Sequence, residues 1–125
     1  MKCLRGASAL ADEMEKAGGA GLRTFVIWEP VLATDWGPPG AAALARMAGR
    51  NVLQFWDRPH ALSAAIRSAG DDDRILGARR LKNPIVWDYV AVFAPGVRWD
   101  DRFPVPVYAG APVLDVIDEL RPHLR

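Results

Sequence analysis

The first segment of the chain places apolar and charged side chains with the period of a helix. Apolar residues recur at steps of three and four from Leu4 to Ala17, and acidic and basic residues take the opposite face. Gly18 and Gly19 follow and provide the stop. The pattern predicts an amphipathic helix that packs one face against a core.

Three later runs have the apolar, β-branched and aromatic composition of strands, at residues 24–28, 51–56 and 85–93. The first run, Thr-Phe-Val-Ile-Trp, is nearly continuous in apolarity. Such a run is typical of a strand that is buried on both faces, as in a parallel sheet. These three runs predict the centre of a sheet.

The segment after the third run predicts a hairpin. Residues 94–96 (Ala-Pro-Gly) indicate a turn, and residues 97–99 begin a returning strand. Residues 103–108 are also extended in pattern, but Pro104 and Pro106 confine them to the edge of a sheet.

Helical patterns fill the spaces between these strands. An alanine-rich helix is expected at residues 41–48, and a second helix follows Asp57 as its N-cap and carries Leu62 to Ala69. A final helix carries Val113 to Leu120 on one face. The order helix, strand, helix, strand, helix, strand, strand, helix predicts a single α/β domain over residues 1–125. Its sheet is expected to be mostly parallel, with a C-terminal β-hairpin and flanking helices.

Composition narrows the class of protein. The 125 residues are 50% hydrophobic and carry a net charge of +1, so no field of one sign points to nucleic acid or an anionic membrane. No apolar stretch reaches the roughly 20 residues of a spanning helix, and acidic residues interrupt the first segment, which argues against a signal peptide. We expect a cytoplasmic protein with no cofactor and no metal site.

The single cysteine, Cys3, carries the strongest candidate chemistry. It stands at the start of the first predicted helix, where unpaired N–H groups and the helix dipole favour a thiolate, with Lys2 and Arg5 nearby. One cysteine excludes an internal disulfide and a zinc site built from cysteines. The alternative interpretation is a small, unreactive residue near a frayed end.

The order of elements, with three local segments, resembles a thioredoxin-like domain of a bacterial group of poorly defined function. The segments are Phe25 to Leu32, Gln54 to Asp57, and Trp87 to Phe93 followed by Pro95-Gly96. The resemblance implies a thioredoxin-like fold whose first strand is missing and whose first helix begins at Cys3. Gly6 stands where a Cys-x-x-Cys motif would have its second cysteine, unless Cys3 is itself that second cysteine and the first lay upstream of Met1.

The resemblance also implies where other residues lie. Trp87 and Asp88 occupy the position of the family's cis-proline and are expected beside Cys3. The missing strand is internal in this fold, so the strands around Ile27 and Val90 are left with open edges. We expect either self-association through such an edge, as a homodimer, or a natural start upstream.

Tryptophans next to acidic residues supply candidate binding residues, because three such pairs fall at strand ends, where α/β sheets place ligand crevices. Indoles with carboxylates can hold a cationic or polar ligand. The binding-surface candidates are Trp87, Asp88, Glu29, Pro30 and Trp36. His60 and His123 lack partners at zinc-ligand spacing and are expected on the surface.

Two functions are consistent with these patterns. In the first, Cys3 performs monothiol redox chemistry by attacking a disulfide or an oxidant, with a thiol or disulfide partner protein or glutathione as the partner. An external thiol then releases the mixed disulfide, because the chain holds no resolving cysteine. In the second, the domain is a non-catalytic binding or interaction module on the same scaffold. The sequence leaves both open.

Overall fold

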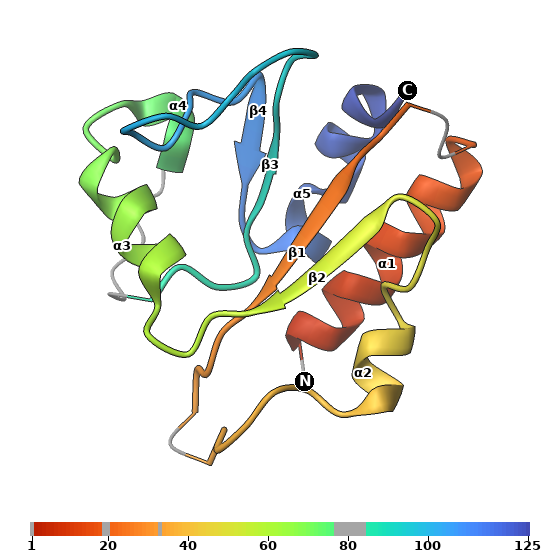
Figure 1. Cartoon of the computed structure of the whole chain (residues 1–125). Helices are drawn as coiled ribbons and strands as arrows, with labels where there is room; N and C mark the ends of the chain where they lie inside the picture. Colours follow the sequence, from red (N-terminus) through yellow and green to blue (C-terminus); the bar gives the residue numbers. More distant parts are fainter. Residues whose placement is uncertain (1, 19–20, 33, 77–84) are drawn as a thin grey trace.

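The structure is a computed structural model that describes residues 2–18, 21–32, 34–76 and 85–125, without the side chain of Lys2. Its elements, in chain order, are α1 (Lys2–Lys16), β1 (Thr24–Trp28), α2 (Ala41–Ala45), β2 (Val52–Trp56), α3 (Ala61–Ser68), α4 (Asp73–Leu76), β3 (Val90–Val92), β4 (Tyr108–Gly110), α5 (Val113–Leu120) and the 3₁₀ helix η1 (Arg121–Leu124). The mixed α/β character expected from the sequence is confirmed. In Figure 1, α3 and α4 lie beside β3 and β4, and α1 and α2 lie on the side of β2.

The described strands form two separate pairs. β1 and β2 are parallel, with Phe25 opposite Leu53, whereas β3 and β4 are antiparallel, with Ala91 opposite Ala109. Among the described strands, no ladder of hydrogen bonds joins β1 to β3. The expected parallel pairing and C-terminal hairpin are therefore present, but the expected single sheet is divided between β1 and β3.

Helices α1 and α2 cover one face of the β1–β2 pair. The Thr24 hydroxyl lies 3.9 Å from the Met14 sulfur of α1, and the Gln54 side chain donates a 2.9 Å hydrogen bond to the Leu44 carbonyl of α2. The opposite face is open: Phe25, Leu53 and Phe55 are each at least half exposed. The prediction that β1 is buried on both faces is therefore wrong, because the next helix, α3, packs instead against the β3–β4 side.

The core of the molecule lies between α3, α4 and β3. Its buried side chains are Ile66, Ala69, Ile75, Val86 and Phe103. The Tyr89 hydroxyl donates a hydrogen bond to the Ile75 carbonyl, which ties the approach to β3 to α4. Burial raises the pKa of Tyr89. The short helix α4 is absent from the sequence prediction.

The predicted hairpin is shifted along the chain. Residues 97–99 and 103–107 are not strands, and the strand that returns to β3 is β4. Phe103 turns its ring into the core and contacts Phe93 and Trp99 edge to face, with ring centroids 5.6 and 5.3 Å apart. This burial fixes the segment against α3 and α4, so the chain reaches β3 only after Pro106.

Helix α1 is joined to α5 and η1 by an ion pair. The Arg121 guanidinium lies 2.7 Å from the Glu13 carboxylate, which also accepts from Lys16 at 3.0 Å. Hydrogen bonds from Arg121 and Lys16 lower the pKa of Glu13 to about 2. The pair ties the C-terminal part of α1 to the end of the closing helix α5.

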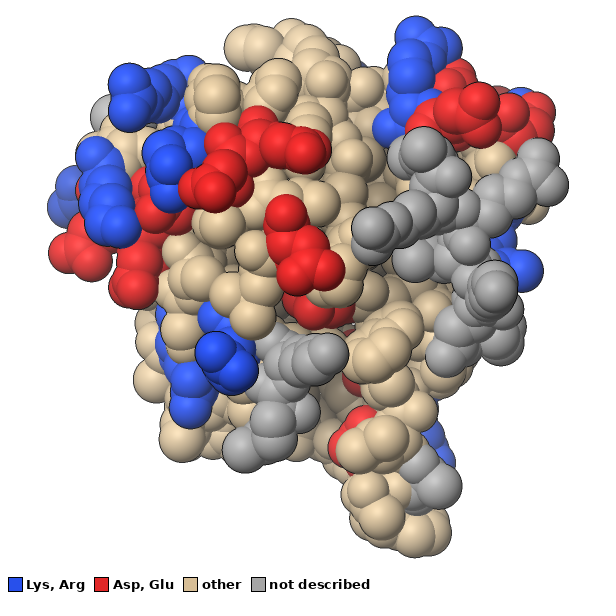
Figure 2. All heavy atoms as spheres, turned by 180° about the vertical axis from the view of Figure 1, so that it is seen from behind, with Lys and Arg blue, Asp and Glu red and all other residues tan. Residues whose placement is uncertain are grey.

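Charged groups of both signs lie together on the face seen in Figure 2, where Lys and Arg adjoin Asp and Glu. The Arg102 guanidinium forms an ion pair with Asp71 at 2.7 Å. Among the residues that the structure describes, no helix has the length and apolar character needed to cross a membrane.

Candidate functional site

Cys3 lies in the first turn of α1 with a half-buried side chain, and is not in a disulfide. Burial raises the pKa of the thiol, and the negative charge of Asp88 raises it further. This direction is opposite to the one expected from the helix N-terminus alone. A raised pKa favours the thiol over the nucleophilic thiolate, so reaction at Cys3 needs a group that accepts the proton.

Asp88 is the candidate for this proton acceptor. Its backbone has φ of 52°, in the left-handed region that few residues other than glycine, asparagine and aspartate adopt. This turn of the chain directs its carboxylate against α1 at Gly6, where a Cβ on residue 6 would lie 2.7 Å from the Asp88 Oδ1. The expectation that Asp88 lies beside the start of α1, near Cys3, agrees with this geometry.

Gly6 is the feature of this site that the sequence left unexplained. A Cβ there would also lie 3.2 Å from the Val113 Cβ of α5, so Gly6 lets both Asp88 and α5 approach the first turns of α1. The only signal in the sequence was a glycine inside a predicted helix, since such a glycine often marks a close approach of another segment. Gly6 therefore has a packing role that is independent of any missing cysteine.

A hydrogen-bonded cluster supports the segment that carries Asp88. The Ser63 hydroxyl of α3 donates to the Glu29 carboxylate at 2.6 Å and accepts from the Val86 N–H at 2.9 Å. Glu29 directly follows β1, and Val86 precedes Asp88 by two residues. The serine thus fixes the end of β1 and the approach to Asp88 to one point on α3.

The Glu29 side chain is largely covered in this cluster, and its pKa is raised. Burial raises the pKa, donation from Ser63 opposes the shift, and a hydrogen bond to Asp57 raises it again. The His60 ring lies 3.5 Å from the same carboxylate. Glu29 therefore holds elements together and is not turned toward solvent as a ligand-binding carboxylate.

The N-cap position of α3 is held by His60 and not, as was predicted, by Asp57, but the Asp57 side chain still accepts N–H groups at the start of this helix. Its carboxylate accepts the N–H groups of Ala61 at 3.0 Å and Leu62 at 2.8 Å. Burial alone would raise its pKa, but these N–H groups hold the pKa of Asp57 below its usual value. These contacts are those of an acidic residue at a helix start.

The loop after β1 approaches the start of α1. Asp35 accepts the N–H groups of Val31 at 2.9 Å and Leu32 at 2.8 Å, which lower its pKa. Its charge contributes to the raised pKa of Cys3. Trp36 is 87% exposed and Pro30 is partly buried. The structure thus brings Asp88 and Asp35 toward Cys3, while Trp36 extends into solvent.

Trp87 is also on the surface, with 42% of its area exposed. It directly precedes Asp88 in the chain. Among the described residues, no group of three or more His, Cys, Asp or Glu side chains could hold a metal ion.

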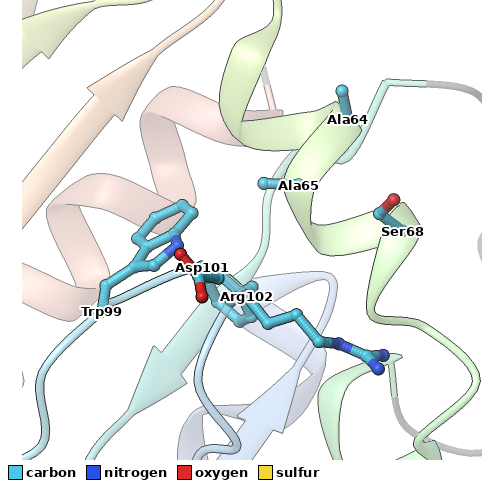
Figure 3. A pocket seen from close by; sticks show the side chains of 7 residues that line it. Ala64, Ala65, Ser68, Trp99, Asp101 and Arg102 are labelled. Carbon is cyan, nitrogen blue, oxygen red and sulfur yellow. The ribbon is translucent and has the colours of Figure 1, made fainter.

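A hollow lies away from Cys3, between α3 and the segment before β4. It measures about 480 Å³ and is lined by Trp99, Asp101, Arg102 and Phe103, with small α3 residues Ala64, Ala65 and Ser68 opposite. Figure 3 shows the Trp99 indole and the Arg102 side chain along its rim. It is open and shallow, and Arg102 already pairs with Asp71. None of the binding residues predicted from the sequence lines this hollow.

Comparison of the chain with protein-family models, with curated proteins and with solved structures gave no match.

Proposed function

We propose that this chain is a thioredoxin-like, cytoplasmic monothiol protein in which Cys3 exchanges with disulfides and Asp88 accepts the thiol proton. The observation that carries the proposal is the placement of the Asp88 carboxylate against the first turns of α1, where it acts on the Cys3 thiol. The order of elements, with a parallel pair, an antiparallel pair and a closing helix, is compatible with the scaffold.

Burial and the Asp88 charge raise the pKa of the Cys3 thiol and so favour its protonated form. Asp88 takes the proton as the Cys3 sulfur attacks one sulfur of a disulfide, for which oxidised glutathione is the simplest example. A mixed disulfide forms and a thiolate leaves, which recovers the proton from Asp88. A second, external thiol then attacks the mixed disulfide and releases Cys3, since this chain has one cysteine.

The test measures mixed-disulfide formation between the protein and oxidised glutathione at pH 7 by intact mass. We expect the modified form in the wild type and none in Cys3→Ser. Asparagine also adopts the left-handed backbone of residue 88. In Asp88→Asn we expect mixed-disulfide formation about tenfold slower, because the loss of the general base outweighs the rise in the thiolate fraction.

The opposite outcome has a clear meaning. If Asp88→Asn forms the mixed disulfide faster than the wild type, Asp88 acts on the thiol only through its charge, and the proposal is wrong. If neither protein is modified, the thiol exchange itself is wrong.

A second candidate is a non-catalytic interaction domain that forms homodimers. It is favoured by the open face of β1–β2, where the rings of Phe25 and Phe55 stack with centroids 6.5 Å apart and both side chains are at least half exposed. Exposed apolar clusters of this kind mark interaction sites. Light scattering tests it: a dimer in the wild type that becomes a monomer in Phe55→Lys supports it, and a wild-type monomer contradicts it.

A further inference from the structure

Two carboxyl groups meet where the parallel strands β1 and β2 end. Trp28 pairs with Trp56 at the last step of the ladder, and the Asp57 N–H donates to the Trp28 carbonyl at 2.8 Å. Glu29 and Asp57 follow these tryptophans, so they lie side by side, and their side chains form a hydrogen bond. A hydrogen bond between two carboxyl groups needs one proton, because an ionised carboxylate can only accept.

The other contacts of the pair indicate where this proton resides. Asp57 accepts the N–H groups of Ala61 and Leu62, which hold its pKa low and keep it ionised. Glu29 accepts the Ser63 hydroxyl at 2.6 Å and the Ser63 N–H at 3.3 Å, yet burial raises its pKa. The shared proton is therefore carried by Glu29 and donated to Asp57.

The described titratable side chains that face Glu29 come from two segments. Asp57 follows β2, and the His60 ring, just before α3, lies 3.5 Å from the Glu29 carboxylate. The approach to β3 contributes the uncharged backbone of Val86, and Asp88 beyond it places its carboxylate against α1. The protonation of Glu29 thus depends on one acidic and one basic neighbour.

A chain of hydrogen bonds leads from this pair to the approach to β3. The Val86 N–H donates to the Ser63 oxygen at 2.9 Å, and the Ser63 hydroxyl donates in turn to Glu29. Only 7% of the Glu29 side chain is exposed, so water contributes little to the solvation of a second negative charge beside Asp57. With the proton present the pair carries one negative charge, and without it two charges repel each other in a largely covered site.

We propose that Glu29 and Asp57 share one proton and form a pH-dependent clamp, which holds the end of β1, the start of α3 and the approach to β3 together. When the proton passes to solvent, repulsion between the two carboxylates displaces Glu29. Ser63, which bridges Glu29 and Val86, moves with it, and the Val86 N–H is released. Because Val86 precedes Asp88 by two residues, the release also changes the thiol site, a consequence that rests on the function proposed above.

The direction of the pH dependence follows from Glu29. Burial and the hydrogen bond to Asp57 raise its pKa above the ordinary value of 4.5, so folding favours the protonated form. The stabilising contribution is complete below about pH 4.5 and is lost as the pH rises through the folded pKa. The clamp is therefore closed at lower pH and open at higher pH.

The shared proton is measured by the carbon-13 chemical shift of the Glu29 carboxyl group, followed by NMR over a pH titration of the full chain. We expect a midpoint above 4.5 in the wild type. In Asp57→Asn the midpoint is expected at lower pH, because the amide donates to the Glu29 carboxylate and adds no charge. Asparagine is also favoured at helix starts, so the contacts with α3 are kept.

The release is measured by hydrogen exchange of the Val86 amide, corrected for the intrinsic pH dependence of exchange. In the wild type we expect its protection to fall by about fivefold or more through the Glu29 midpoint, the equivalent of about one hydrogen bond. Glu29→Gln, whose amide donates and accepts without ionising, is expected to keep the protection constant.

Two control variants are expected to retain the fall in protection. Glu15→Gln removes the same charge from an exposed position of α1. His60→Asn removes the basic neighbour of Glu29, and asparagine suits the left-handed backbone of residue 60, where φ is 58°.

Three results would overturn the proposal. The first is a Glu29 midpoint at or below 4.5, or one that Asp57→Asn leaves unchanged. The second is protection of the Val86 amide that stays constant with pH in the wild type, or a fall that persists in Glu29→Gln. The third is a fall that His60→Asn alone abolishes, which assigns the titration to the histidine.

The two measurements are independent of each other and of the thiol. If Glu29→Gln does not fold, the carbon titration of the wild type and of Asp57→Asn still tests the shared proton. Neither measurement involves Cys3, so failure of the clamp and failure of the thiol exchange are distinguished.

Discussion

Gly6 and Asp88 act together beside Cys3: Gly6 lets the Asp88 carboxylate approach α1, and the Asp88 charge adds to the effect of burial on the thiol pKa. The sequence placed Asp88 near the thiol through the resemblance, but it contained no signal for the left-handed conformation, which depends on contacts with α1. It attributed Gly6 to the loss of a cysteine. The structure gives Gly6 a physical reason, since any side chain there would meet both Asp88 and α5.

Substituting Gly6 by alanine tests this reason. Alanine is favoured in a helix interior by about 1 kcal/mol, but its Cβ would displace Asp88 and press on Val113. We therefore expect Gly6→Ala to be less stable than the wild type in urea, and its thiol to react with iodoacetamide at lower pH, because the carboxylate has moved away.

Ala9→Gly in the same helix is the matched control. It is expected to lose about 1 kcal/mol of stability through helix propensity while the thiol reacts as in the wild type. A Gly6→Ala protein that is more stable than the wild type and has unchanged thiol reactivity would show that the close approach is not a constraint.

The longest periodic element was the easiest to predict. The helix expected from Leu4 to Ala17 is α1, because a regular apolar face over four turns has no competing interpretation. The strand expected at residues 85–93 is shortened to β3. Its first residues are diverted because Val86 bonds to the Ser63 side chain and Asp88 turns out of the strand conformation. Both causes are contacts with residues that are far away in the sequence.

The link between α1 and α5 gives stability that depends on pH. The folded pKa of Glu13 is about 2, below its ordinary value of 4.5, so its ionised form is favoured by folding. This contribution is complete above about pH 4.5 and is lost as the pH falls toward 2. We expect Arg121→Ala to be less stable than the wild type at pH 7, with a difference that shrinks toward pH 2.

Chemical denaturation at several pH values measures this difference. Arg125→Ala is the control, since this arginine is exposed at the end of the chain and is expected to change stability little at any pH. A difference between Arg121→Ala and the wild type that stays constant from pH 7 to pH 2 would contradict the role of the Glu13–Arg121 pair.

At the scale of the molecule, the site is formed by three segments that are distant in the sequence. The start of α1, the loop after β1 and the approach to β3 converge because Ser63, Gly6 and the α1–α5 contact hold them together. The sequence predicted the helices and strands, and the resemblance placed the segment of Asp88 beside the start of the first helix. It could not show that the sheet divides between β1 and β3, because strand pairing depends on contacts between residues far apart in the chain.

The central claim is that Cys3 and Asp88 form one chemical unit. The most direct measurement is the pH dependence of Cys3 alkylation by iodoacetamide, followed by mass spectrometry, in the wild type and in Asp88→Asn. We predict a thiol pKa above its ordinary value in the wild type and a lower pKa in Asp88→Asn, because the negative charge opposes formation of the thiolate. The same thiol pKa in both proteins would contradict the account.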